Sequence, residues 1–341
     1  MKTFIITGAN GFVGNNLIRE IDSRYGAEAT ARAIVLPKTD LSPLAGLPCT
    51  IFEGDITRPE TLETAFDLSP AKEDQIYVIH CAGIIDISAK ENPLLHTINV
   101  EGTKNVINAT IDLETRSQTR PKFIYVSSVH ALPEKPHGQQ MSEITTFDPN
   151  AVVGQYAKSK AAATQLVFDA MKAGELNGSV VFPSGIIGPF DFSPENMKRL
   201  VDQIARGKLR ICVKGGYDFV DVRDVAHGIL QACELGKNAE GYLFTNKTIP
   251  IKEICNDVCA FAGLPPIKIA LPIGLAKAFA PISERYYRIR HEVPLFTAYA
   301  LHTLEANSNF SHAKATQELG YKTRPLQETI FDMLAWMETR S

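Results

Sequence analysis

The chain has 341 residues, of which 45% are hydrophobic and 21% are charged, and its formal net charge at pH 7 is −3. This composition is typical of a soluble globular protein. Because no block of Lys and Arg stands out, it argues against nucleic acid and membranes as partners and leaves a small molecule. The length allows one large α/β domain, with or without a smaller appended lobe.

Short β-branched runs alternate with helical patterns through the first half of the chain. This alternation predicts a parallel sheet covered by helices on both faces, and right-handed crossovers make it an α/β, Rossmann-type doubly wound sheet. The predicted strands are residues 3–7, 33–36, 50–53, 75–81, 122–127 and 179–182, and the predicted helices are residues 10–23, 60–66, 93–113 and 156–172.

The composition of the sequence changes near residue 185. After this point prolines and glycines are frequent, and strands and helices no longer alternate regularly. We predict a main domain over residues 1–185 and a smaller C-terminal substrate lobe over residues 186–341, some of whose segments return to the main domain. The elements expected in this second half are a strand at 220–222 and helices at 224–234, 251–262 and 326–337.

The six cysteines form no C-x-x-C pair. Cys255 and Cys259 are four residues apart on an expected helix, but no His follows them closely, so buried reduced thiols are favoured over a metal site. We therefore expect no metal and a reducing, cytoplasmic location. The apolar stretch 269–282 is shorter than the ~20 residues of a membrane span and is expected to cover something apolar.

A glycine-rich turn, G-A-N-G-F-V-G, follows the first strand and opens the first helix. Glycines let the backbone approach a pyrophosphate closely, and the helix N-terminus adds free N–H groups and a positive dipole end. The position and both flanking elements agree, so we predict dinucleotide binding here. The residues expected to bind the dinucleotide are Gly8, Asn10, Gly11, Phe12, Val13 and Gly14.

Two further strand ends bear on the nucleotide. Asp55, followed by Ile56, could accept the adenine amino group, although a turn aspartate before Arg58 is the alternative. The second strand ends without an acid that would bind a ribose hydroxyl, and Lys38 follows it closely. This favours NADP over NAD, although Asp40 stays possible as a ribose ligand.

The motif Y-A-K-S-K places Tyr156 and Lys160 four residues apart, on one face of a helix. An adjacent ammonium lowers the pKa of a phenol, so this pair can exchange a proton with a substrate oxygen. Ser128 lies at the carboxyl end of a predicted strand, the edge where a doubly wound sheet presents its ligands. We expect it to orient the substrate oxygen, with Ser127 as the alternative.

The segments TGANGFVG, GDIT, HCAG, YVSS and YAKSK, in this order, resemble the extended short-chain dehydrogenase/reductase superfamily, also called the NAD-dependent epimerase/dehydratase family. The resemblance covers nearly the whole chain. It is greatest to the dihydroflavonol-4-reductase-like and 3β-hydroxysteroid-dehydrogenase-like branch. It implies a catalytic triad of Ser128, Tyr156 and Lys160, with Tyr156 and Lys160 also contacting the cofactor.

The resemblance implies further cofactor contacts. Asn99 would support a proton relay, unless it only caps a helix start. The residues that would pass the middle of the cofactor or lie beside its nicotinamide are Cys81, Ala82, Gly83, Pro183 and Ile186. The residues after the serines, V-H-A-L, lack the Tyr-Gly pair of many sugar-nucleotide enzymes, which weakens that alternative.

We therefore expect an NADP-dependent reductase that converts a ketone or aldehyde of a small, apolar molecule to an alcohol. The alternatives are an NAD-dependent nucleotide-sugar epimerase or dehydratase and, less favoured, a non-catalytic NADP-binding redox sensor. The helices from about Pro93 and Tyr156 could pair with their copies in a homodimer, as the superfamily resemblance implies.

Several other residues near the expected site are weaker candidates. A metal site at the histidines would need ligands that converge. Asp224 is expected to cap a helix beside a surface arginine, Arg223, rather than contact substrate. The remaining candidates are His80, His130 and His137, near the predicted active edge, and Tyr286, Tyr287, Arg288 and Arg290, in the lobe expected to close over substrate.

Overall fold

The computed structural model describes residues 1–68, 74–86, 91–193, 196–278 and 298–340. Within them, seven parallel strands form the main sheet in the order β10-β6-β5-β4-β1-β2-β3. This is the doubly wound order, in which the chain reverses its direction of travel between β1 and β4. The strands are β1 (Lys2–Thr7), β2 (Ala29–Val35), β3 (Thr50–Glu53), β4 (Gln75–His80), β5 (Lys122–Val126), β6 (Gly178–Pro183) and β10 (Glu240–Phe244).

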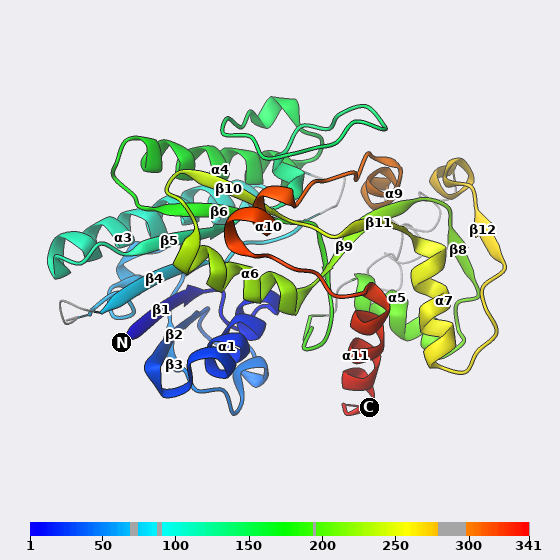
Figure 1. Cartoon of the computed structure of the whole chain (residues 1–341), viewed down its shortest axis with the longest axis horizontal. Coiled ribbons are helices and arrows are strands. Elements are labelled where there is room, and N and C mark those ends of the chain that lie inside the picture. The colour runs from blue at the N-terminus through cyan, green and yellow to red at the C-terminus, as the bar shows by residue number, and fades with distance from the viewer. Residues whose placement is uncertain (69–73, 87–90, 194–195, 279–297, 341) are drawn as a thin grey trace.

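Helices cover both faces of the sheet (Figure 1). Helices α1, α6 and α10 pack on one face, and α3 and α4 pack on the other. Strand β1 shows why both faces are apolar: Phe4 and Ile6 enter one core and Ile5 enters the other. The covering helices are α1 (Phe12–Tyr25), α2 (Leu94–His96), α3 (Gly102–Ser117), α4 (Gln155–Lys172), α6 (Val222–Leu235) and α10 (Ala313–Leu319).

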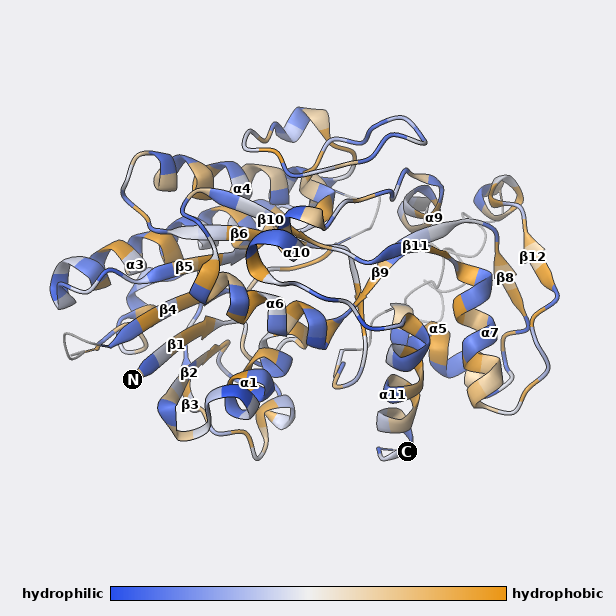
Figure 2. Ribbon diagram, in the orientation of Figure 1, coloured by the Kyte–Doolittle hydropathy of each residue, from blue (hydrophilic) through white to orange (hydrophobic). Residues whose placement is uncertain are grey.

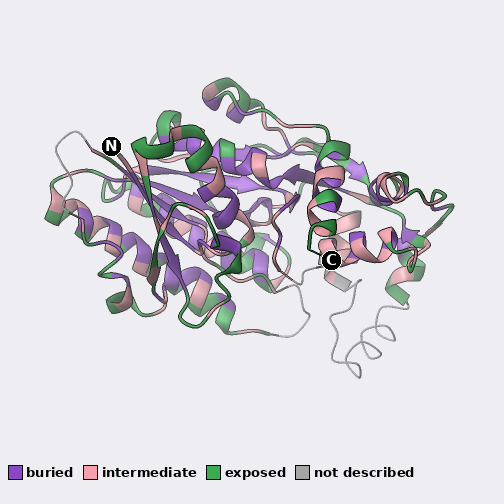
Figure 3. Ribbon diagram, turned by 90° about the horizontal axis from the view of Figure 1, so that it is seen from below, coloured by how far each residue is buried: buried purple, intermediate pink, exposed green. Residues whose placement is uncertain are grey.

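The burial and hydropathy patterns follow this layering. The central strands of the main sheet are apolar and buried, whereas its covering helices carry both apolar and polar residues (Figures 2 and 3). The sheet core includes Phe4, Phe123 and Tyr125, each with no exposed surface. Each fully buried aromatic side chain contributes roughly 1.5–3 kcal/mol to folding.

The C-terminal residues build a smaller lobe beside the carboxyl edge of the main sheet (Figure 1). One small sheet has the order β11-β9-β7, and a second pairs β12 with β8. The elements are β7 (Gly185–Ile187), α5 (Asn196–Ala205), β8 (Ile211–Val213), β9 (Gly216–Asp221), β11 (Lys247–Pro250), α7 (Ile251–Phe261), β12 (Ile269–Leu271), α9 (Ala298–Glu305) and α11 (Leu326–Glu338).

Several predicted boundaries are wrong. Strand β2 begins at Ala29 rather than residue 33, and the helix predicted at 60–66 is a single 3-10 turn, Pro59–Leu62. The helix predicted over 93–113 is interrupted by a π-helical turn, Thr97–Glu101. Strand β10, which follows the expected domain boundary, pairs with β6 as the edge of the main sheet.

Candidate active site

The glycine turn has the close packing that a dinucleotide-binding turn needs. Gly8 has a φ of +66°, and a Cβ there would lie 2.8 Å from the Cα of Ala82. A Cβ on Gly14 would lie 2.4 Å from the carbonyl oxygen of Gly8. Gly11 caps α1 without any side-chain hydrogen bond, so the first-turn N–H groups stay available to an anion. The turn therefore fits a pyrophosphate.

The end of strand β2 carries the residues that bear on the choice of cofactor. Asn10 donates from Nδ2 to Thr39 Oγ1 at 3.2 Å and to the Asp40 carbonyl at 3.1 Å. The Asp40 carboxylate accepts from the backbone N–H and the hydroxyl of Ser42, and these bonds lower its pKa. Lys38 is exposed and has a φ of +62°. Thus the carboxylate is engaged in its own turn, whereas the ammonium faces solvent.

Asp55 follows strand β3 and forms a local turn. Its Oδ1 accepts from the backbone N–H of Thr57 at 2.9 Å and from the Thr57 hydroxyl at 2.7 Å. Ile56 is buried beneath α3, where a Cβ on Gly102 would come within 2.6 Å of its Cδ1. The turn interpretation of Asp55 is therefore present in the structure, and adenine contact stays a prediction.

The end of strand β4 packs against the glycine turn on one side and the expected catalytic residues on the other. The Ala82 N–H donates to Thr7 Oγ1 at 3.2 Å. A Cβ on Gly83 would lie 3.0 Å from Asn99 Oδ1 and 3.6 Å from Lys160 Nζ. Cys81 precedes them, and burial raises the pKa of its thiol to about 12. This segment thus links the dinucleotide turn with α4.

The two serines after strand β5 have different partners. Ser127 is buried and shares a hydrogen bond of 2.7 Å with the Thr164 hydroxyl on α4. Ser128 begins a 3-10 turn, and its Oγ accepts from the His130 N–H at 3.3 Å. An oxygen that accepts there keeps its own hydrogen for another acceptor. Ser128 is therefore better suited than Ser127 to donate to a substrate oxygen.

Tyr156 and Lys160 both lie in the first two turns of α4 and are nearly buried, with 7% and 6% of their surfaces exposed. Lys160 donates from Nζ to the Val126 carbonyl at 3.0 Å and to the Tyr125 hydroxyl at 3.4 Å. Burial lowers the pKa of Lys160 to about 8, and nearby Cys81 opposes this shift. The ammonium is thus held between the end of β5 and α4.

Asn99 lies in the π-helical turn that interrupts the predicted helix. Its Nδ2 donates to the Ile84 carbonyl and to Ser159 Oγ, both at 3.0 Å, and its Oδ1 accepts from the Ile84 N–H at 2.9 Å. It does not cap a helix start through its side chain. π-helical turns are frequent at functional sites, and this one aims the amide at the segment around Gly83.

The segment expected beside the nicotinamide joins the two domains. Pro183 ends β6 and Ile186 lies in β7. Between them, Ser184 donates to the buried carboxylate of Asp218 at 2.5 Å. Burial raises the pKa of Asp218 to about 6. This hydrogen bond fixes the segment to β9.

The other histidines do not converge. His80 is buried between the hydroxyls of Thr7 and Thr103, at 2.7 and 3.0 Å, and burial lowers its pKa to about 3. His137 is exposed in a loop. Among the described residues, no group of three or more His, Cys, Asp or Glu could hold a metal ion.

The remaining candidates have structural roles or fall outside the description. Asp221 caps α6, so the prediction that Asp224 does so is wrong, and Asp224 instead accepts from Arg324. Arg223 pairs with Asp221 at 2.6 Å.

All six cysteines are free thiols, with Cys255 and Cys259 buried. Four candidates lie outside the described residues: Tyr286, Tyr287, Arg288 and Arg290. No helix of the described residues is long and apolar enough to span a membrane.

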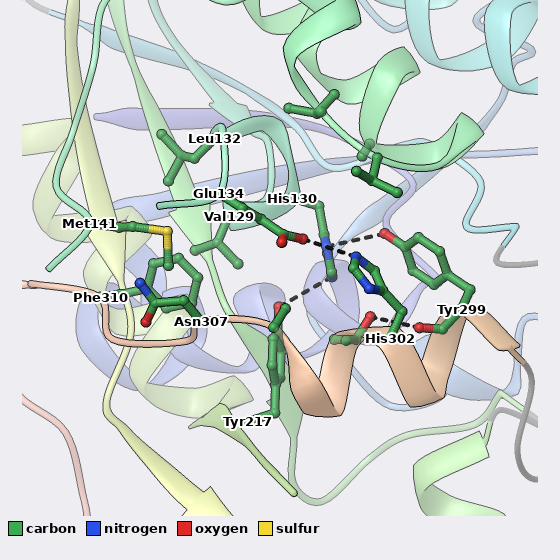
Figure 4. Close-up of a pocket in the computed structure, with 15 residues that line it drawn as sticks. Val129, His130, Leu132, Glu134, Met141, Tyr217, Tyr299, His302, Asn307 and Phe310 are labelled. Carbon is green, nitrogen blue, oxygen red and sulfur yellow. Dashed lines mark hydrogen bonds and ion pairs between the residues drawn. The ribbon is translucent and has the colours of Figure 1, made fainter. Parts of the chain in front are cut away.

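A small, partly open cavity lies next to His130, and the sequence did not reveal it. It has a volume of about 30 Å³ and is lined largely by residues 129–157 and 299–310 (Figure 4). His130 at its wall meets the Tyr156 ring edge-on, with 5.9 Å between ring centroids. No described residue of the stretch 269–278 lines this cavity. Tyr217 and Tyr299 also line it, and no local motif marks either residue.

The fold, the glycine turn and the Tyr-Lys helix define a nicotinamide-dependent oxidoreductase of the short-chain dehydrogenase/reductase type. Residues 4–243 match the NAD dependent epimerase/dehydratase family, and the chain belongs to this family. This confirms the resemblance seen in the sequence.

Similar proteins cover the whole chain. One is sterol demethylase protein B of Methylococcus capsulatus, 26% identical over 99% of each chain. Another is 3beta-hydroxysteroid-dehydrogenase/decarboxylase isoform 1 of Arabidopsis thaliana, 27% identical over 96% of this chain and 77% of that protein. Among solved structures, gox2253 has a TM-score of 0.82 and 29% identity, covering 99% of this chain and 98% of that one.

Proposed function

We propose that this enzyme uses NADPH to reduce a ketone or aldehyde on a small, apolar molecule. The observation that carries the proposal is the placement of Tyr156 and Lys160 on one face of α4, which packs against the end of β5 and the turn that Ser128 begins. A small cavity with many apolar lining residues lies nearby. The names of two similar proteins, a hydroxysteroid dehydrogenase and a 2-alkyl-3-oxoalkanoate reductase, support oxidoreduction of apolar molecules.

The bound nicotinamide supplies the hydride for the carbonyl carbon. Tyr156 donates its phenol proton to the carbonyl oxygen as negative charge develops there. Ser128 Oγ donates a hydrogen bond to the same oxygen and orients it. The Lys160 ammonium stabilises the phenolate that Tyr156 becomes after it loses the proton. Asn99 and Gly83 position the neighbouring backbone.

The preference for NADP rests on Lys38 and Asp40. A 2′-phosphate needs a cation and the absence of a competing acid. The exposed Lys38 meets the first condition. The Asp40 carboxylate accepts two hydrogen bonds from Ser42, which hold it within its own turn rather than toward a ribose. A reducing cytoplasm, which suits six free cysteines, is part of the same proposal. A homodimer through α3 and α4 stays a prediction.

A panel of aldehydes and ketones assayed separately with NADPH and NADH tests the reaction. We expect reduction with NADPH, and a loss of at least about 100-fold in kcat for Tyr156→Phe with unchanged NADPH binding. Near-normal turnover by this variant would reject the mechanism. Purified protein that carries NAD and consumes no NADPH would instead favour a nucleotide-sugar epimerase.

A further inference from the structure

Two consecutive residues at the end of β5 bind the Lys160 ammonium. Its Nζ donates to the Tyr125 hydroxyl at 3.4 Å and to the Val126 carbonyl at 3.0 Å. The ammonium also lies 5.0 Å from the centroid of the Tyr125 ring. Tyr125 has no exposed surface, and Lys160 has 6% of its surface exposed. The Tyr125 phenol is therefore a buried partner of this lysine.

His80 packs against the Tyr125 ring and is itself fixed in place. The two rings stack with 5.5 Å between their centroids and 27° between their planes. Thr103 donates its hydroxyl hydrogen to the Asn99 carbonyl at 2.6 Å, so it must accept from the Nε2–H of His80. Because His80 is neutral, its Nδ1 then accepts from Thr7 Oγ1 at 2.7 Å. These bonds set the tautomer and the position of the imidazole that supports the Tyr125 ring.

The titratable groups that face the ammonium are His80 and Cys81 at the end of β4, Tyr125 on β5, and Tyr156 one helical turn earlier on α4. Burial, followed by the charge of Lys160, lowers the pKa of His80 to about 3. Burial raises the pKa of Cys81 to about 12 and that of Tyr125 well above its usual value. These three groups are neutral near pH 7, and none of the four is a carboxylate. The buried ammonium therefore depends on neutral oxygen acceptors.

We infer that Tyr125 is a positioning residue, whose hydroxyl keeps the Lys160 ammonium protonated and in place one helical turn from Tyr156. The inference rests on the proposed function, because that reaction needs a charged lysine to stabilise the phenolate. An ammonium has three hydrogens, and Tyr125 and Val126 accept two of them. Hydrogen bonds to a charged group are stronger than neutral ones, so loss of the Tyr125 acceptor should favour the uncharged amine.

An NMR titration of Lys160 tests this role without turnover. The probe is the Cε resonance of isotope-labelled Lys160, assigned by its absence from Lys160→Met. We expect a midpoint of about 8 in the wild type. In Tyr125→Phe, which keeps the ring and removes the acceptor, the midpoint should be about one pH unit lower. An unchanged or higher midpoint in this variant overturns the inference.

A second measurement does not require the Tyr125 variant to fold. When the ammonium loses its proton, the hydrogen bond to the Tyr125 oxygen loses its charge, so the Cζ resonance of Tyr125 should shift with the midpoint of Lys160. Tyr156→Phe removes the other tyrosine beside the ammonium. In that variant one tyrosine resonance should still follow the Lys160 titration. If none follows it, the phenol of Tyr125 does not bind the ammonium.

A matched control separates this contact from the general loss of a phenol. Tyr77 is a buried tyrosine on the neighbouring strand β4, but it packs in the core on the opposite face of the sheet. Its hydroxyl donates to Gln75 at 3.1 Å. Tyr77→Phe should therefore keep the wild-type midpoint of Lys160, and a lowered midpoint in this variant would contradict the inference.

Turnover separates the inference from the proposed function. For Tyr125→Phe, kcat with NADPH should fall about 10-fold at pH 9 and less than about 2-fold at pH 6.5, because only the protonated lysine supports the reaction. An equal loss at both pH values would show a merely structural defect and contradict the inference. A lowered midpoint in a protein that reduces no carbonyl would uphold the role of Tyr125 and reject the proposed function. Reduction with NADPH and an unchanged midpoint would do the reverse.

Discussion

Lys160 donates a hydrogen bond from Nζ to the Val126 carbonyl across 3.0 Å, which ties α4 to the carboxyl end of β5. The ammonium is nearly buried, and burial lowers its pKa from 10.5 to about 8. Burying the Lys160 ammonium therefore costs the folded protein free energy. The difference between the two pKa values corresponds to about 3 kcal/mol.

Lys160→Met should abolish most catalysis and change how stability depends on pH. Below pH 8 both the folded and the unfolded wild type carry the proton, so the full cost is present. Between pH 8 and 10.5 only the unfolded state keeps it, so wild-type stability rises with pH. Relative to the variant, the wild type should gain about 2 kcal/mol between pH 7 and 9.5 in urea denaturation.

The control for this measurement is Lys158→Met, which removes an exposed lysine from the same helix. It should retain catalysis and follow the wild-type pH dependence. If Lys160→Met also follows the wild-type curve, the ammonium is not held in a buried, destabilised state.

The two serines after β5 should separate stability from catalysis. Ser127→Ala removes a buried hydrogen bond to Thr164, so we expect a loss of about 1 kcal/mol in unfolding free energy with little change in kcat. Ser128→Ala removes the hydroxyl that we propose donates to the reacting oxygen, so kcat should fall about 100-fold at nearly constant stability. The reverse pattern would assign the catalytic hydroxyl to Ser127.

Local sequence patterns predict the sheet and the expected catalytic edge because those features depend on neighbouring residues. The glycine turn, the strand-end serines and the Tyr-Lys helix each lie within one short segment. Strand β2 is longer than predicted because residues 29–32 pair with residues 2–5 of β1, contacts that no local pattern reveals.

The cavity depends on tertiary contacts and was therefore missed. Tyr217 and Tyr299 come from separate elements of the lobe, and only folding brings both to His130. The sequence suggested His130 as a weak metal candidate, and the structure gives it two phenol partners instead.

We propose that the cofactor preference depends on one exposed lysine. If Lys38 binds the 2′-phosphate, Lys38→Ala should raise the KM for NADPH about 10-fold and leave the KM for NADH unchanged. Steady-state kinetics with both cofactors measure the split. Lys104→Ala, at an exposed position on α3, controls for the loss of a surface charge. Equal changes for NADPH and NADH would contradict the assignment of Lys38 to the phosphate.

Gly154 couples the start of the catalytic helix to the cavity wall. Its φ is +97°, and a Cβ there would lie 2.4 Å from Cε2 of Tyr299. Gly154→Ala should therefore add backbone strain and also displace the Tyr299 ring. We expect a loss of roughly 2–3 kcal/mol in unfolding free energy.

Gly138→Ala isolates the backbone contribution. Gly138 also has a positive φ, +85°, but a Cβ there would meet no atom within 4 Å. The variant should lose about 1 kcal/mol in unfolding free energy, because only backbone strain is added. Chemical denaturation compares the two variants. Equal losses of unfolding free energy in both variants would contradict this expectation. They would show that the Tyr299 ring moves away from the new methyl group at no cost in free energy.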